Sequence, residues 1–378
     1  MYKRFADIFK TDNRIFGLDL LRFAAIVLVV LGHARWMTAT FPKPLRAILH
    51  GSGILGVELF FVLSGFLIGG ILLKQFEKNN FSLDFNAVKN FWIRRWFRTL
   101  PTYYLILMVY VMFYFLDRPA TLWKYFFFLQ NIWNYPPYFF EESWSLCIEE
   151  ISYLISPLLL SVSVIWFGKN NKGKASYFLY ISVLLIIIVT ILRIIYSKYF
   201  LQPDYKWSYH FREVALIRLD AIYFGFILAY IAQYNYSFWK KMSLPALIIG
   251  LLGIAVLMAF QKKITDDHQS LLSNVLFSPM LSIFISLIIP YLSEYKQTKY
   301  QFLAKPITGI SIISYSLYLI NGGLFAESFK YYSNGGANWN FTTALLVYLL
   351  FWALCLGVSA VIFVFFEKPM TDLRNKFK

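Results

Sequence analysis

The sequence predicts an all-α integral membrane protein, a polytopic bundle of about ten transmembrane helices, from its composition and its long apolar runs. Of the 378 residues, 59% are hydrophobic and only 15% are charged, which would leave a soluble globule with too much exposed apolar surface. Several apolar runs approach or exceed the ~20 residues that a helix needs to cross a bilayer, which separates them from buried core helices.

Ten apolar segments are predicted as helices. In chain order they cover residues 17–37, 54–73, 99–116, 143–166, 176–198, 213–232, 243–260, 271–292, 307–328 and 342–366. An aromatic stretch from Trp123 to Trp133 follows the third segment, and its Trp and Tyr enrichment favours an interfacial segment over a further half-span.

The loops between these segments differ in their basic residues. The two tails and the loops 74–98, 167–175, 233–242 and 293–306 hold 22 Lys and Arg, whereas the loops on the opposite side hold 9. The positive-inside rule therefore predicts cytoplasmic termini. No loop is long enough for a soluble domain, so residues 1–378 are expected to form one transmembrane domain with no appended soluble domain. The basic N-terminus is expected to be retained, because no small-residue cleavage site follows the first apolar run closely.

The net charge of +16 does not indicate nucleic-acid binding, because the basic residues are scattered among short loops and form no patch. The two cysteines, Cys147 and Cys355, lie in apolar context without disulfide or metal-ligand spacing, and they are expected to serve in packing. No metal ion is expected.

Three ionisable residues share one face of the first segment: Asp19, Arg22 and His33. Arg22 and His33 are eleven residues apart, which puts both side chains on nearly the same face, about 16 Å apart along the axis. Ionisable residues inside a span are costly and normally face a protein interior or a wet cavity, which makes them functional candidates. The structural alternative is that Asp19 only holds Arg22 while His33 reaches the interface.

Polar residues of other segments fall at a similar depth when each is counted from the outer end of its helix. Five of them differ in depth by only about 5 Å, and a sixth lies slightly deeper: His33, Glu58, Glu149, Arg218 and Asn321, then Asp220. We expect them to share a cavity in which His33 takes and returns a proton and Glu149 orients its imidazole. The alternative is that polar residues near helix ends simply reach the headgroups.

A segment rich in arginine and aromatic residues, from Phe91 to Arg98, precedes Pro101 at the predicted inner surface. Arg94, Arg95 and Arg98 offer guanidinium forks that match phosphate oxygens, and the neighbouring rings can hold a purine. Positive-inside anchoring with interfacial Trp is the alternative.

These segments together form a set of motifs that runs along nearly the whole chain. In order they are Gly17–Arg22 with His33, Gly56–Ile68, Arg94–Pro101, Ser143–Glu150, Arg218–Ala221 with Gly225, Ser314–Leu319 and Glu367–Pro369. In this set the chain resembles acyltransferase family 3, the bacterial membrane-bound acyltransferases that modify surface glycans.

The resemblance implies a multi-pass protein of the bacterial inner membrane that takes an acyl-CoA, usually acetyl-CoA, from the cytoplasm. The acceptor would be a hydroxyl of a surface glycan or glycolipid. By position, the resemblance assigns Arg22 and His33 to the first-helix pair and Glu149 to the tryptophan motif. It assigns Arg94, Arg95 and Arg98 to the donor side.

The chain also departs from the family pattern. Glu58 stands where aspartate is common, and Asn321 stands where histidine often ends the motif, which puts a role for that position in doubt. Ile151 and Ser152 replace the usual Gln-Phe.

In the expected mechanism, the inner arginines bind the phosphates of CoA, and the pantetheine arm extends outward past Arg22. His33 deprotonates the acceptor hydroxyl, which attacks the acyl carbon directly. Arg218 or nearby backbone donors would stabilise the oxyanion. The remaining residues expected on the acceptor or oxyanion side are Glu58, Trp144, Ser145, Asp220 and Asn321. Ser145 is the less favoured nucleophile, since nothing in the sequence shows that it meets a base.

Two other classes of function remain open at the level of sequence. A secondary transporter with an intramembrane charge relay would also have ten spans and a charged layer, although it leaves the arginine-aromatic segment unexplained. A catalytically inactive scaffold that binds a glycan or lipid would keep the same fold.

Overall fold

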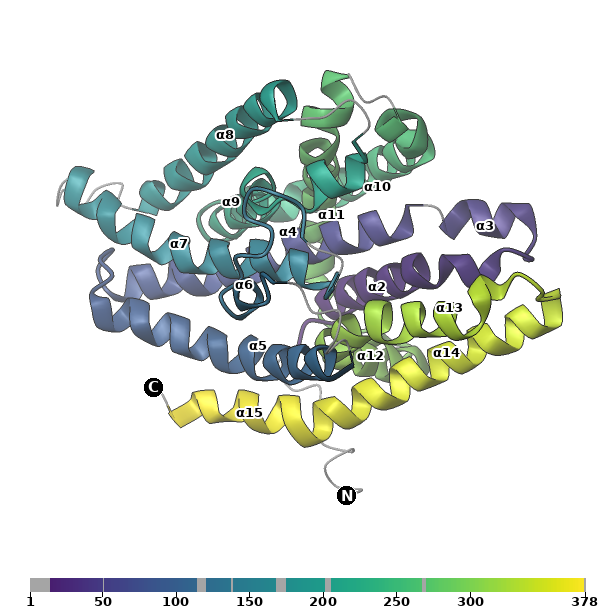
Figure 1. Cartoon of the computed structure of the whole chain (residues 1–378). Coiled ribbons are helices and arrows are strands. Elements are labelled where there is room, and N and C mark those ends of the chain that lie inside the picture. Colours follow the sequence, from purple (N-terminus) through teal and green to yellow (C-terminus); the bar gives the residue numbers. More distant parts are fainter. Residues whose placement is uncertain are drawn as a thin grey trace.

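The computed structural model describes residues 14–49, 51–113, 120–136, 139–167, 175–200, 205–266 and 270–376. Within these ranges every regular element is a helix, which confirms the all-α prediction. The α-helices are α2 (Phe16–His33), α3 (Lys43–Leu49), α4 (Ser52–Lys78), α5 (Phe85–Phe113), α6 (Trp123–Phe126), α7 (Ser143–Phe167), α8 (Ala175–Tyr199), α9 (Asp220–Tyr234), α10 (Tyr236–Asp266), α11 (Phe277–Glu294), α12 (Gln301–Ile320), α13 (Ser328–Tyr332), α14 (Phe341–Ile362) and α15 (Lys368–Asp372) (Figure 1).

Eight helical segments of the described chain are long and apolar enough to cross a membrane, so the protein is a polytopic membrane protein. They are Phe16–Thr38, Ser52–Lys78, Ser143–Val164, Ala175–Tyr199, Tyr236–Asp266, Leu272–Glu294, Gln301–Tyr332 and Phe341–Lys376.

Two of the ten predicted segments differ from the structure in a way that affects the site. The segment predicted at 99–116 belongs to α5, which begins at Phe85, so the arginine-aromatic segment is helical and not a loop. The segment predicted at 213–232 is the 15-residue α9, preceded by a π-helical turn (Ser208–Arg212) and a 3₁₀ turn (Ala215–Ile217). At 1.5 Å per residue α9 is only about 22 Å long, shorter than the apolar core of a bilayer.

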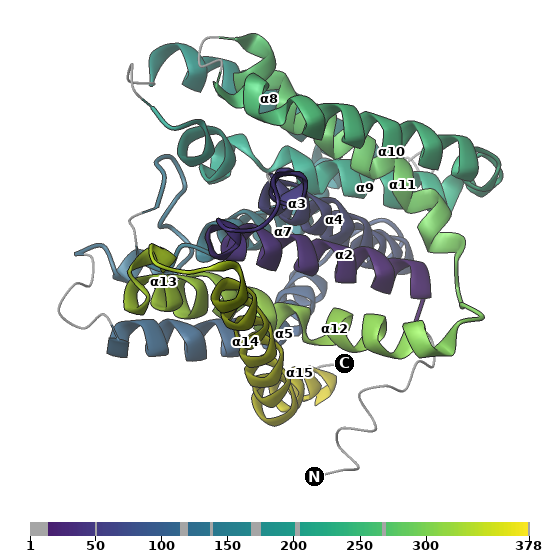
Figure 2. The same ribbon diagram turned by 90° about the vertical axis from the view of Figure 1, so that its right-hand side faces the viewer.

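The helices form three layers that are visible in both ribbon views. α8, α9, α10 and α11 lie on one side of the central helices α2, α4 and α7, and α5, α12, α14 and α15 lie on the other (Figures 1 and 2). The central helix α4 packs closely on α9, where a Cβ on Gly65 would come within 2.1 Å of the Ile222 carbonyl oxygen. Glycine therefore permits the close helix approach that is common in membrane bundles.

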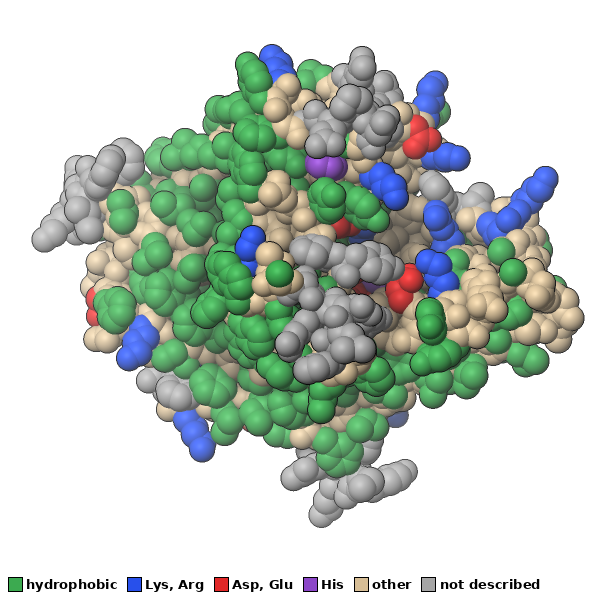
Figure 3. Space-filling view, in the orientation of Figure 1, with side chains coloured by type: hydrophobic (Ala, Val, Ile, Leu, Met, Phe, Trp, Pro, Cys, Tyr) green, Lys and Arg blue, Asp and Glu red, His purple; other side chains and the backbone are tan. Residues whose placement is uncertain are grey.

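The outer surface is largely apolar. On the face shown in Figure 3, hydrophobic side chains spread over the left half and the lower part, and Lys and Arg lie mainly along the right side and the margins. Leu251 and Leu252 of α10 are 52% and 62% exposed, which suits contact with lipid.

Candidate active site

Two adjoining recesses open into the bundle around Arg22. The wider one, of about 510 Å³, lies between the start of α2, α12 and the C-terminal segment, and the narrower one, of about 90 Å³, lies between α2, α4, α5, α7 and α12. Four residues line both: Arg22, Arg98, Ser314 and Tyr315. The wider recess is lined by more basic than acidic groups, with Arg14, Arg22, Arg98, Lys368 and Arg374 against Asp19, Glu367 and Asp372.

Arg22 lies where the two recesses meet. Its Nη1 donates to Asp19 Oδ1 at 3.1 Å and to Ser311 Oγ at 3.2 Å. Asp19 also accepts from Arg14 Nε at 2.8 Å, so the carboxylate is shared between two guanidinium groups. The Asp19–Arg22 pairing considered from the sequence is therefore present, and it holds Arg22 at the junction.

The arginines of α5 divide between two faces of the helix. Arg95 and Arg98 are three residues apart, which turns both toward the recesses. Arg94 is exposed and lines neither recess.

Glu149 lies beside the arginines of α5. Its Oε2 lies 3.8 Å from Arg95 Nη2, and the guanidinium of Arg95 lies 4.3 Å above the ring of Tyr153. The pairing with His33 expected from the sequence is wrong in this respect, because the face of α7 that carries Glu149 is turned toward α5. The Nδ1 of His33 has another partner.

His33 ends α2 and is held by Asn321, the first residue of a π-helical turn, Asn321–Glu327. His33 Nδ1 and Asn321 Oδ1 are 2.6 Å apart. Asn321 Nδ2 donates to the carbonyls of Leu317 and Tyr318, both at 2.9 Å, which fixes the orientation of the amide. The Asn321 oxygen can therefore only accept, so Nδ1 of His33 carries the hydrogen and Nε2 of the neutral ring keeps a lone pair.

The π-helical turn brings a buried carboxyl group, Glu142, to the same place. Glu142 Oε1 accepts from the backbone N–H of Gly323, and its Oε2 accepts from Tyr110 OH at 3.1 Å. A Cβ on Gly322 would lie 2.2 Å from Glu142 Oε1 and 3.0 Å from His33 Nδ1, so these two atoms are within about 5 Å of each other. Only glycine at position 322 leaves room for both groups.

Glu142 was not among the residues predicted from the sequence. It precedes α7 directly, beside Glu141, and two carboxylates just before a helix are ordinary at an N-terminus. The sequence thus held no specific signal for it. Burial raises the pKa of Glu142 to about 7, while its hydrogen bonds favour the ionised form.

Ser145 and Tyr318 close the narrow recess on the side nearest Glu142. Ser145 Oγ and Tyr318 OH are 2.6 Å apart, and Tyr318 OH donates to the backbone carbonyl of Glu142 at 3.1 Å. One turn further along α12 lies Asn321. Within the described residues Ser145 therefore hydrogen-bonds to a phenol and a carbonyl and not to His33, which agrees with its being the less favoured nucleophile.

Trp144 lies beneath Arg212, a second residue that the sequence did not reveal. The guanidinium of Arg212 is 4.9 Å from the Trp144 ring centroid and donates to the Gly53 carbonyl at 3.2 Å. Arg212 and Glu327 both contribute to the electrostatic environment of His33. The Trp144 ring therefore holds the guanidinium of Arg212 in place through a cation–π contact.

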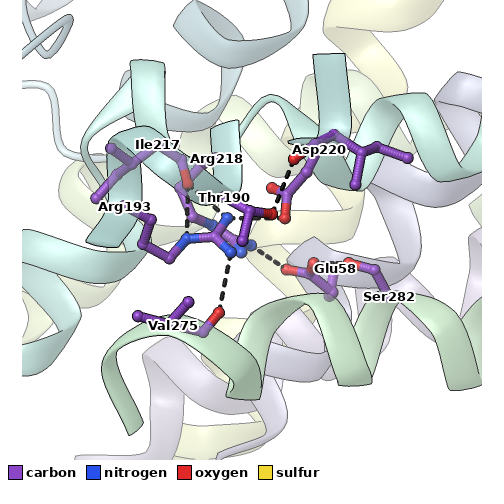
Figure 4. A network of polar contacts seen from close by, with 9 residues as sticks. Glu58, Thr190, Arg193, Ile217, Arg218, Asp220, Val275 and Ser282 are labelled. Carbon is purple, nitrogen blue, oxygen red and sulfur yellow. Dashed lines mark hydrogen bonds and ion pairs between the residues drawn. The ribbon is translucent and has the colours of Figure 1, made fainter. Parts of the chain in front are cut away.

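The other predicted residues form a separate buried network. Glu58 pairs with Arg218 and accepts from Ser282, and Asp220 pairs with Arg193 at 2.7 Å (Figure 4). The expectation that Glu58, Arg218 and Asp220 share one cavity with His33 is corrected here, because similar depth does not fix the direction in which a side chain points. Their bonds join α4, α8, α9 and α11.

The fold and the site define the class: a multi-pass helical membrane protein with arginine-lined recesses at one end of its first helix and a histidine, hydrogen-bonded to Asn321, at the other. The family model described as an acyltransferase domain matches residues 15–364, and the chain therefore belongs to acyltransferase family 3.

Curated relatives include the peptidoglycan O-acetyltransferase OatA of Listeria monocytogenes, 29% identical over 325 residues, covering 80% of this chain and 48% of the relative. The O-acetyltransferase OatA of Staphylococcus aureus is 26% identical, with 94% and 57% covered, and a putative O-acetyltransferase of the same species is 27% identical, with 86% and 53% covered. The chain thus spans about half the length of these relatives. No solved structure gives a significant match.

Proposed function

We propose that this protein is a membrane O-acetyltransferase that moves an acetyl group from acetyl-CoA to a hydroxyl of a cell-envelope glycan or glycolipid, with His33 as general base. The proposal rests on the hydrogen bond between His33 Nδ1 and Asn321 Oδ1. Because Asn321 accepts from Nδ1–H, Nε2 is left as the proton acceptor. The names of the relatives support an O-acetyl transfer to a glycan.

The donor half of the proposal assigns the wider recess to the nucleotide phosphates of CoA. Its excess of guanidinium and ammonium groups suits phosphate oxygens, and Arg95 and Arg98 lead from there toward the narrow recess. The pantetheine arm would follow α2 from Arg22 to His33. Since α2 is one continuous helix, these residues are about 16 Å apart along its axis.

The chemical step is a direct transfer. His33 Nε2 takes the proton of the acceptor hydroxyl as its oxygen attacks the thioester carbonyl, and a C–O bond forms. The C–S bond then breaks, and the imidazolium gives its proton to the departing CoA thiolate. Base and acid are the same ring, so no acyl-enzyme is required.

The proposed side for the donor is the cytoplasm, and the proposed location is the bacterial inner membrane with both termini inside. The excess of basic residues in the loops at one end of the bundle supports this orientation.

The test uses membranes that contain the protein, labelled acetyl-CoA and the envelope glycans of the host. We expect His33→Ala to lower label transfer by about 10²–10⁴-fold, because proton removal from the acceptor is lost. His210→Ala is the matched control, since His210 Nδ1 is bonded to Tyr196 OH at 2.9 Å and lies outside the site. Equal transfer by wild type and His33→Ala would refute the assigned base.

A further inference from the structure

We infer that Glu142 is a positioning residue for His33, and that its ionised carboxylate stabilises the imidazolium that forms during transfer. This role rests on the proposed function of His33. It belongs to a residue outside the motifs on which the family resemblance stands, and it fills the place that Glu149 had been expected to fill.

The geometry supports an electrostatic role. Glu142 is 2% exposed, and its Oε1 lies within about 5 Å of His33 Nδ1 with no side chain at Gly322 between them. Two unit charges at that distance attract strongly in a site from which water is largely excluded. The interaction exists only after His33 has taken the proton, so it favours the transition state over the ground state.

The surroundings of Glu142 include groups from several elements. Tyr110 of α5 and the Gly323 N–H donate to the carboxyl group, and the adjacent Glu141 opposes its ionisation. Arg212 and Glu327, which have opposite charges, also contribute to the electrostatic environment of His33. Among the acids named here, Glu142 is the one whose carboxyl group accepts a hydrogen bond from the turn that holds the histidine.

This arrangement makes the transfer rate depend on pH near neutrality. Burial raises the pKa of Glu142 to about 7, so the carboxylate is formed as pH rises through 7 and is lost as pH falls below it. Transfer should therefore rise over this range.

The test measures transfer of labelled acetyl groups against pH for three variants of the full chain in membranes. Glu142→Gln keeps an acceptor for the Gly323 N–H but removes the charge. We expect the rate at pH 8 to fall about 10- to 100-fold and the midpoint of the acid limb to move to lower pH, because the protonated imidazole loses its partner. Glu141→Gln, the adjacent control, should keep more than half of the rate.

Tyr110→Phe should move the midpoint of the acid limb of the pH profile in the opposite direction. The carboxylate loses a hydrogen-bond donor that favours its ionised form, so the acid limb should move to higher pH while the rate at pH 8 is largely kept. A purely structural role for Glu142 produces no pair of opposite shifts. It would also leave the midpoint unchanged if Glu142→Gln lowered the amount of folded protein.

The outcomes separate the two proposals. If Glu142→Gln has the wild-type rate and midpoint while His33→Ala is inactive, the role of Glu142 is refuted and the proposed function stands. If His33→Ala is active, the proposed function itself fails. If Glu142→Gln is missing from membranes, the pH profile of Tyr110→Phe provides the test. An acid limb with the wild-type midpoint would then refute the role proposed for Glu142.

Discussion

Asn321 shows how one side chain can define the chemistry of another. Its amide is oriented by two backbone carbonyls, those of Leu317 and Tyr318, so that its oxygen meets His33 Nδ1. The replacement of a possible histidine by asparagine removes a titrating group but supplies a firm acceptor. A position that looked doubtful in the sequence thus has a clear physical role.

We predict that Asn321→Ala lowers acetyl transfer by about 10- to 100-fold, because His33 loses the acceptor that fixes its tautomer and ring orientation. The KM for acetyl-CoA should change little, since Asn321 lines neither recess. Steady-state kinetics on membranes will separate the two parameters. A drop in affinity for the donor without a drop in kcat would contradict this assignment.

Helix α5 shows what an element adds to a motif. As one helix from Phe85 to Phe113, it places Arg95 and Arg98 in the lining of the recesses and leaves Arg94 outside it. The sequence-based prediction treated the three arginines as equivalent because a loop has no faces. The helical period makes them different.

We predict that Arg95→Gln and Arg98→Gln each weaken acetyl-CoA binding about tenfold, since each removes a cation from the recess. Arg94→Gln is the matched control, with an expected change of less than about twofold because its side chain lines neither recess. Isothermal titration with CoA in detergent would measure all three. If Arg94→Gln had the largest effect, the assignment of the recess to the donor would be wrong.

The π-helical turn that follows α12 is the second element on which the site depends. It extends from Asn321 to Glu327 and presents a backbone N–H to Glu142 beside the histidine. Such turns inside helices are frequent at functional sites, because they release backbone groups from the regular ladder. Gly322 and Gly323 have the small size that this close packing needs.

At the scale of the whole molecule, buried charges serve two purposes in separate places. The pairs Glu58–Arg218 and Arg193–Asp220 join α4, α8 and α9 at the centre of the bundle, with every side chain at most 4% exposed. Removing one partner of such a pair would leave an uncompensated buried charge, which costs about 3–5 kcal/mol. The arginines that line the two recesses instead border space that a ligand can enter.

The orientation of the whole bundle gives a prediction that does not depend on activity. Lys43 of α3 and Lys89 of α5 are both exposed. The distribution of basic residues predicts that Lys43 lies outside the membrane and Lys89 on the cytoplasmic side. A membrane-impermeant maleimide applied to intact cells should label Lys43→Cys and leave Lys89→Cys unlabelled until the cells are opened. The native Cys147 and Cys355 are buried and contribute little background. Labelling of Lys89→Cys in intact cells would reverse the proposed topology.

The sequence by itself determined that this is a helical membrane protein of an acyltransferase family, because lipid requires long apolar helices and the motifs keep their order along the chain. It also singled out Arg22, His33, Arg95 and Arg98. Only the tertiary structure decided which groups meet: Asn321 and Glu142 at His33, Glu149 at Arg95, and Glu58 at Arg218. Depth along a helix follows from counting residues, but the direction of a side chain depends on how each helix is rotated against its neighbours, and packing alone sets that rotation.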